Sequence, residues 1–186
     1  MENNRSREKF DTNLDELGGT VFLGLEDYSS AFPKLFPIEL SSSDSINSTK
    51  YSILILWHET VYAYGYGLSQ ISIMGCRAIA EKILRVVYHT ATGKTLEQGT
   101  LGVIIRECEK VNVESKIMDL AKQIKNYGDD RAHSNLERKD PVMANLGGDS
   151  RVVEILTPSK HLIHPYKGNA KQSILSAREL LFSVFG

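Results

Sequence analysis

The residues best suited to chemistry lie in the polar stretch KNYGDDRAHSN, residues 125–135. In a continuous helix, Lys125, Asp129 and His133 would recur every fourth residue and would share one side. A histidine beside a cation and an acid could transfer protons during phosphodiester cleavage while the cation holds the phosphate, and this chemistry needs no metal. The alternative is a capped helix end, because Gly128 interrupts the stretch.

A helical bundle must position this stretch. Apolar residues recur at helical spacing in five segments: residues 51–64, 68–88, 101–111, 115–124 and 169–185. The segment 68–88 is apolar around so much of its circumference that we predict it at the centre of the bundle. Gly93 is a plausible stop for that helix, Thr100 offers an N-cap for the next, and a fourth helix begins near Ser115 and runs into the polar stretch.

The remaining segments lack this periodicity. Residues 1 to about 17 are predicted to form a disordered or loosely attached tail, and residues 41–50 a polar linker. Between residues 137 and 169, RVVEIL and HLIHPY flank TPSK like the arms of a hairpin. We therefore predict an all-α, antiparallel helical bundle with a small β-hairpin insertion before the last helix. Residues 1–50 would form a tail and covering segment, and residues 51–186 the helical domain.

Composition restricts the function further. The chain has 186 residues, with 22 Lys and Arg against 23 Asp and Glu, so any binding of nucleic acid must come from a local patch. Cys76 and Cys108 fall in apolar helical patterns and are predicted to be free, buried thiols. The polar N-terminus has no signal-like apolar region, and the apolar run at residues 51–57 is too short to span a bilayer. We expect a soluble, cytoplasmic protein that does not contact a membrane.

Other candidate motifs carry less weight. TGKT at residues 92–95 lacks the first glycine of a phosphate-binding loop, and His161 with His164 has no partnering ligands for a metal site. Arg77 and Glu81 lie four residues apart on the long helix, and Glu81 and Arg85 repeat that spacing. They form either a solvated charge ladder or, as we favour, a network that braces the polar stretch.

Three short elements resemble the HEPN superfamily of α-helical domains, and more narrowly a bacterial branch of uncharacterised domains. RAIAE at residues 77–81 matches an R-A-x-x-E element, and GKTL at residues 93–96 matches a turn. Gly128 and His133 match a terminal R-x-x-G-N-x-x-x-H element, in which Lys125 replaces the arginine and Asp129 the asparagine. The match covers residues 66–135 well and the last helix loosely.

The resemblance implies a function connected with RNA in a bacterial or phage-related defence or toxin–antitoxin system. Many HEPN proteins are metal-independent endoribonucleases, usually homodimers, whereas others bind RNA or a partner without catalysis. The implied catalytic residues are His133, Lys125, Asp129 and Arg131. The implied RNA-binding residues are Lys125, Asn126 and Arg131, and the supporting residues are Arg77 and Glu81. No metal or cofactor is implied.

The two departures from the family pattern predict weak or absent cleavage. Lys125 keeps the positive charge but lacks the planar fork of an arginine, and Asp129 adds negative charge where RNA would bring more. Arg131 lies at a different spacing and would compensate from a neighbouring turn. The alternative function is a noncatalytic, partner-binding helical module. We also expect self-association through the face that carries the polar stretch, with an aromatic contribution from Tyr62, Tyr64, Tyr66 and Tyr127.

Overall fold

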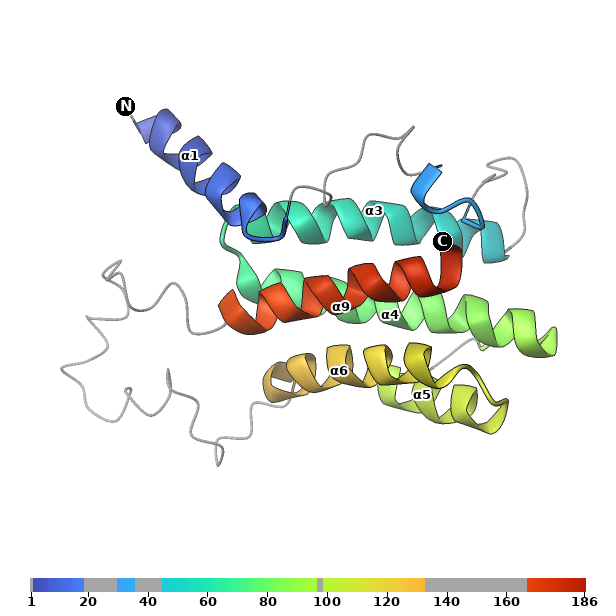
Figure 1. Ribbon diagram of the computed structural model, residues 1–186. Coiled ribbons are helices and arrows are strands. Elements are labelled where there is room, and N and C mark those ends of the chain that lie inside the picture. Colours follow the sequence, from blue (N-terminus) through green and yellow to red (C-terminus); the bar gives the residue numbers. More distant parts are fainter. Residues whose placement is uncertain (1, 19–29, 36–44, 97–98, 133–166) are drawn as a thin grey trace, which may run out of the picture.

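The computed structural model describes residues 2–18, 30–35, 45–96, 99–132 and 167–186. Within these ranges the chain forms six long helices and no strand (Figure 1): α1 Glu2–Asp15, α3 Ser45–Gly65, α4 Ser69–Thr92, α5 Leu101–Lys110, α6 Ser115–Ala132 and α9 Lys167–Phe185. The prediction of a helical bundle is confirmed for the described residues. Both arms of the predicted hairpin lie in residues 133–166, outside the described part of the chain.

Helix α4 is the centre of the bundle, as its apolar circumference predicts. It packs against α3, α5, α6 and α9 (Figure 1). Ile73, Ile79 and Ile83 are completely buried along it, because side chains three and four residues apart line one side of a helix. Gly93 ends the helix in the left-handed conformation, at φ 69°, and its N–H donates to the carbonyl of His89 at 2.8 Å. Glycine adopts this conformation without the steric cost of a side chain.

The helices form two antiparallel pairs along the chain, α3 with α4 and α5 with α6, and α9 runs parallel to α4 (Figure 1). Helix α9 packs against both α4 and α6 and so closes the bundle. The C-terminal end of α6 therefore lies at the same end of the molecule as the turn between α3 and α4 (Figure 1). This arrangement brings the polar stretch close to the beginning of α4.

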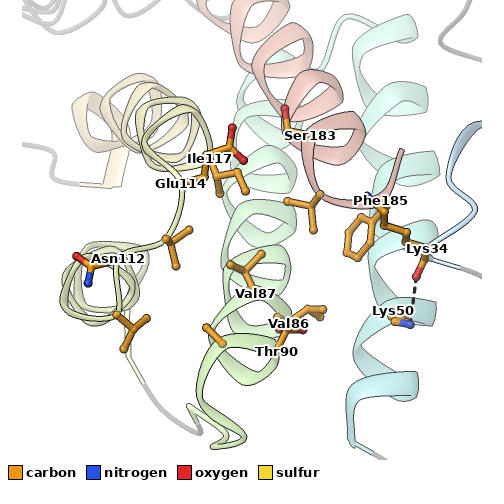
Figure 2. Close-up of a pocket in the computed structure, with 14 residues that line it drawn as sticks. Lys34, Lys50, Val86, Val87, Thr90, Asn112, Glu114, Ile117, Ser183 and Phe185 are labelled. Atoms are coloured by element: carbon orange, nitrogen blue, oxygen red, sulfur yellow. Dashed lines mark hydrogen bonds between the residues drawn. The ribbon is translucent and has the colours of Figure 1, made fainter.

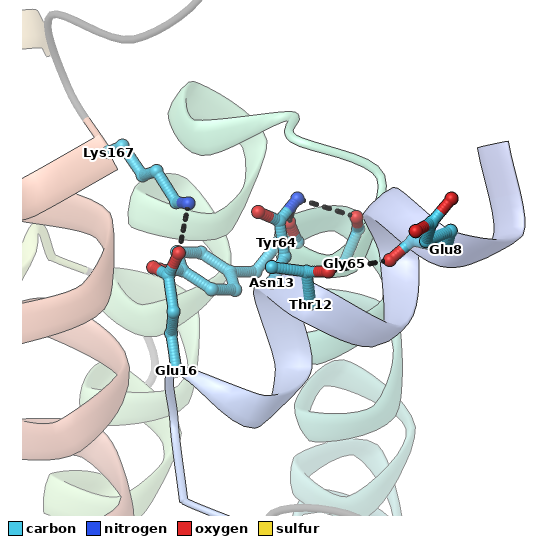
Figure 3. A network of polar contacts seen from close by, with 7 residues as sticks. All are labelled: Glu8, Thr12, Asn13, Glu16, Tyr64, Gly65 and Lys167. Atoms are coloured by element: carbon cyan, nitrogen blue, oxygen red, sulfur yellow. Dashed lines mark hydrogen bonds and ion pairs between the residues drawn. The ribbon is translucent and has the colours of Figure 1, made fainter. Parts of the chain in front are cut away.

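The prediction of a disordered or loosely attached N-terminal tail is wrong in that Glu2–Asp15 form α1, whose later turns pack on α3. The ring of Phe10 lies 4.8 Å from that of Tyr66, centroid to centroid, and Asn13 Nδ2 donates to the carbonyl of Gly65 at 2.9 Å (Figure 3). Such a polar helix has too few apolar residues to reveal itself in the sequence, because tertiary contacts rather than periodicity stabilise it. Residues 45–50 of the predicted linker are likewise helical, as the first turns of α3.

A polar network ties three helices together at this end of the bundle (Figure 3). Glu16, just after α1, accepts a hydrogen bond from the hydroxyl of Tyr64 in α3 at 3.3 Å and forms an ion pair with Lys167 of α9 at 2.5 Å. The hydrogen bond and charge of Lys167 hold the pKa of Glu16 below its ordinary value, and burial raises the pKa of Tyr64. Because the network joins α1 to both α3 and α9, it is structural.

Candidate functional site

Residues 125–132 of the polar stretch belong to α6. The helix passes through Gly128 and extends to Ala132, so Lys125 and Asp129 stand one turn apart on the same side and the backbone of Arg131 is rotated away from them. The side chains of Asp129 and Arg131 are outside the described part of the structure, and so is all of His133. Of the residues expected to contact RNA, the structure describes the side chains of Lys125 and Asn126 but not that of Arg131. The RNA-binding and catalytic roles of the stretch stay predictions.

Lys125 lies across α5. A methyl group built on Gly102 would come within 3.1 Å of Lys125 Cε, so the aliphatic stem of the lysine covers the glycine. A long cationic side chain commonly packs its methylene groups on a neighbouring element and keeps its charged end towards water. The absence of a side chain at residue 102 thus makes room for the lysine between α5 and α6.

The space beside Lys125 is a groove of about 500 Å³ between the two helices. We call it the α5–α6 groove. Its described lining consists of Thr100, Gly102, Val103, Ile105, Arg106, Lys122, Lys125 and Asn126. Three cations and no carboxylate are in this set. Because the chain as a whole carries a formal charge of −1, the groove is a local concentration of positive charge.

Lys122 forms an ion pair at the edge of the groove. Lys122 Nζ lies 2.8 Å from Glu109 Oε1, and both side chains are nearly half exposed. The hydrogen bond and charge of Glu109 raise the pKa of Lys122. Lys122 therefore remains charged at neutral pH, but Glu109 offsets part of its field.

Arg77 packs against α6 at Gly128. A methyl group on Gly128 would overlap the Cδ and Cγ atoms of Arg77, so a side chain at residue 128 would require the arginine to move from the crossing of α4 and α6. Gly128 is buried in this contact, and the helix continues through it. Because Lys125 lies one turn before Gly128 on the same helix, this contact also sets the position of the lysine relative to α4.

Glu81, one turn further along α4, holds the beginning of α5. Its Oε1 accepts a hydrogen bond from the backbone N–H of Leu101 at 3.0 Å. The first N–H groups of a helix lack partners within it, and a carboxylate there also interacts favourably with the helix dipole. Thr100 occupies the N-cap position, as predicted, but its side chain makes no capping hydrogen bond. The cap is supplied by a residue of another helix.

Arg85 completes this series by holding the connection between α4 and α5. Its guanidinium donates hydrogen bonds to the carbonyls of Leu96 and Gly99. Arg77, Glu81 and Arg85 thus contact α6, the start of α5 and the connecting segment, respectively. The contact of Arg77 with the polar stretch at Gly128 is in line with the bracing role we favoured from the spacing, whereas Glu81 and Arg85 form their hydrogen bonds with the beginning of α5 and the segment before it.

The aromatic residues expected at an interface divide into two groups. Tyr64 is buried at 1% exposure and belongs to the core, so its predicted interfacial role is wrong. Tyr62 and Tyr66 are 46% and 64% exposed. Together with three exposed side chains at the beginning of α4 they form what we call the corner patch: Tyr62, Tyr66, Leu68, Ile71 and Met74. Tyr127 of α6 is partly buried.

The cysteines provide no nucleophile. Cys76 and Cys108 are free and buried, as predicted. Burial raises the pKa of the Cys108 thiol to about 11, and desolvation likewise raises the pKa of Cys76. Because the thiolate is the reactive form, both side chains act as small apolar residues of the core.

Two further findings concern the described ranges. They contain no cluster of three or more histidine, cysteine, aspartate or glutamate side chains that could hold a metal ion. Among the described helices, none combines the length and apolar character that crossing a bilayer requires.

Comparisons of the chain with protein-family models, with curated proteins and with solved structures find no match in any of the three. The candidate site therefore depends on the geometry of this chain alone. Lys125 and Asn126 were identified from the sequence, whereas Arg106 and Lys122 were missed as contributors. The available signal was weak: Arg106 falls on the polar face of a short amphipathic helix that folds back beside Lys122.

Proposed function

We propose that this chain is a HEPN-like, RNA-associated domain of a bacterial or phage-related defence or toxin system, and that it binds the RNA backbone in the α5–α6 groove. The observation that carries the proposal is the convergence of Arg106, Lys122 and Lys125 on one groove without a carboxylate in its described lining. RNA supplies a row of phosphates, and binding of such a polyanion is driven largely by cations that replace its counterions.

Each described residue has a defined task in this proposal. Lys125, supported across Gly102, presents a point charge to a phosphate, and Arg106 offers a planar fork from the facing helix. Asn126 supplies an amide that can donate to a phosphate or hydroxyl oxygen. Arg77 and Glu81 position both helices without contacting the RNA.

Cleavage, where it occurs, would be metal-independent and would use His133 for proton transfer beside Lys125 and Asp129. Residue 133 follows α6 directly, because the helix extends to Ala132. We propose that the activity is weak or absent, since Lys125 lacks the bidentate grip of an arginine and Asp129 repels the substrate. The RNA-binding function does not require turnover.

The proposal is tested by measuring binding of a labelled single-stranded RNA to the wild type, Lys125→Gln and Lys116→Gln by fluorescence anisotropy. Lys116 is the matched control: it also lies on α6, it is 54% exposed, and it pairs with Glu179 away from the groove. Lys125→Gln should weaken binding about threefold to tenfold, whereas Lys116→Gln should leave it nearly unchanged. Equal losses in the two variants, or no binding by the wild type, would refute the proposal.

A second candidate is a noncatalytic module that binds a protein partner, which includes a second copy of this chain. The observation that favours it is the corner patch, where Tyr66 is 64%, Ile71 58% and Met74 52% exposed. Several exposed apolar side chains on neighbouring segments are typical of interaction surfaces. Sedimentation of the wild type and of Ile71→Ser distinguishes the candidates: self-association that the substitution abolishes, without loss of RNA binding, would assign the patch to a partner.

A further inference from the structure

A second cavity lies at the other end of the bundle, away from the α5–α6 groove. It has a volume of about 430 Å³ and lies among the last turns of α4, the turn between α5 and α6, the C-terminal end of α9 and the first turns of α3 (Figure 2). Cavities between the helices of a bundle are common sites for small molecules, and this volume is within their usual range.

The walls of the cavity are mainly apolar. Val86 and Val87 come from α4, Val111 and Val113 from the turn between α5 and α6, and Phe185 from the end of α9. Within this turn Asn112 adopts the left-handed conformation, at φ 54°, and the two valines precede and follow it. Asparagine tolerates this conformation better than most residues.

The charged groups are distributed unevenly around the rim. Figure 2 shows Lys34 and Lys50 together on one side, and Asn112 and Glu114 on the other. Lys50 Nζ donates to the backbone carbonyl of Lys34 at 3.3 Å, which holds the ammonium at the rim. An ammonium has three N–H groups, so Lys50 can donate to a bound anion as well.

We propose that this cavity binds a small amphipathic carboxylate of the medium-chain fatty-acid type. The alkyl chain lies against the valines and Phe185, where burial of apolar surface drives binding. The carboxylate faces the ammonium of Lys50, and the negative charge of Glu114 disfavours the reverse orientation. The proposal is independent of RNA binding, because the two sites share no residue.

Titration of the full chain with decanoate, monitored by the backbone amide signals in two-dimensional NMR, tests the proposal. Decanol is the matched neutral probe. Saturable shifts centred on Val87, Val113 and Val184 are expected with decanoate, and binding of decanol should be about fivefold weaker because it lacks the charge. The absence of saturable shifts, shifts centred elsewhere, or equal binding of the two probes would overturn the proposal.

Two variants locate the site. Ala91→Trp places a large side chain at the cavity from an exposed position near the end of α4 and should weaken decanoate binding at least tenfold. Gln70→Trp, at an exposed position near the beginning of the same helix, should leave it unchanged. Lys50→Gln should reduce the decanoate affinity to that of decanol. Unaltered decanoate binding by Ala91→Trp or Lys50→Gln contradicts the proposal. If Ala91→Trp fails to fold, the comparison of decanoate with decanol on the wild type still tests the proposal.

Discussion

Arg77 of α4 lies directly against Gly128 of α6, where a methyl group on the glycine would overlap the side chain of the arginine. The contact fixes how far α6 can approach the central helix, and it lies one turn from Lys125 on the same helix. Any function that depends on the position of this lysine therefore depends on a glycine that has no chemistry of its own.

The first prediction concerns this contact. Gly128→Ala should lower the free energy of unfolding by about 1–3 kcal/mol, because the added methyl group displaces Arg77. In an Arg77→Ala background the same change should be neutral or stabilising by up to about 1 kcal/mol, because alanine favours helix more than glycine does. Denaturant unfolding of the four proteins forms a double-mutant cycle. Additive effects would show that the two residues do not interact.

The second prediction concerns the start of α5. Glu81→Ala should lower the free energy of unfolding by about 0.5–2 kcal/mol, since the N–H of Leu101 loses its acceptor. Glu81→Gln keeps an acceptor oxygen and should cost less. Thr100→Ala should have the smallest effect, because the threonine side chain makes no capping bond. A larger loss in Thr100→Ala than in Glu81→Ala, measured by the same denaturant titration, would reverse this assignment.

The sequence alone was sufficient for the core of the bundle but not for its N-terminal part. The helices that surround α4 have apolar faces at helical spacing, and most of their ends were predicted to within a few residues. The exceptions are α3, which begins at Ser45 rather than residue 51, and α6, which extends past its periodic segment 115–124 to Ala132. Helix α1 was missed because Phe10 and Leu14, together with Leu17 just after the helix, are the few apolar residues that attach it, and they are set among charged residues. Its position depends on α3, which no local pattern reveals.

The candidate site was predictable only in part, for the same reason. Lys125 was identified because it belongs to a short motif. The contribution of Arg106 arises only when α5 and α6 fold back on one another, and the cap of α5 comes from Glu81, twenty residues earlier in the chain. The place of Arg106 in the groove and the cap of α5 both depend on interactions between helices. The apolar periodicity of the sequence indicates only which face of each helix is buried.

The third prediction concerns acid stability. The pKa of Glu16 lies below its ordinary value of 4.5, so the ionised carboxylate stabilises the fold above that value, and the contribution is lost as the pH falls through the lowered pKa. Glu16→Gln should therefore be less stable than the wild type at pH 7, and the difference should shrink towards about pH 3. Unfolding curves at the two pH values test this. A constant difference would mean that the ion pair with Lys167 does not contribute.

The fourth prediction concerns catalysis. His133→Ala should abolish any cleavage of RNA by the wild type and leave the thermal midpoint nearly unchanged, as expected of a residue that acts on substrate. Lys125→Arg should raise the cleavage rate, because a guanidinium restores the bidentate contact with phosphate. Cleavage of a labelled RNA in the presence of a chelator provides the measurement. A loss of stability of about 1–3 kcal/mol in His133→Ala would instead assign the histidine to the fold.

The salt dependence of RNA binding tests the central claim, that the α5–α6 groove holds the RNA backbone. Each phosphate contact contributes about 0.7 to the slope of log affinity against log salt for a single strand, so removal of both cations in Arg106→Gln with Lys125→Gln should make the slope shallower by about 1.4. The double variant Lys110→Gln with Lys116→Gln removes the same charge away from the groove lining and should keep the wild-type slope. The account predicts different slopes for the two double variants; equal slopes would contradict it.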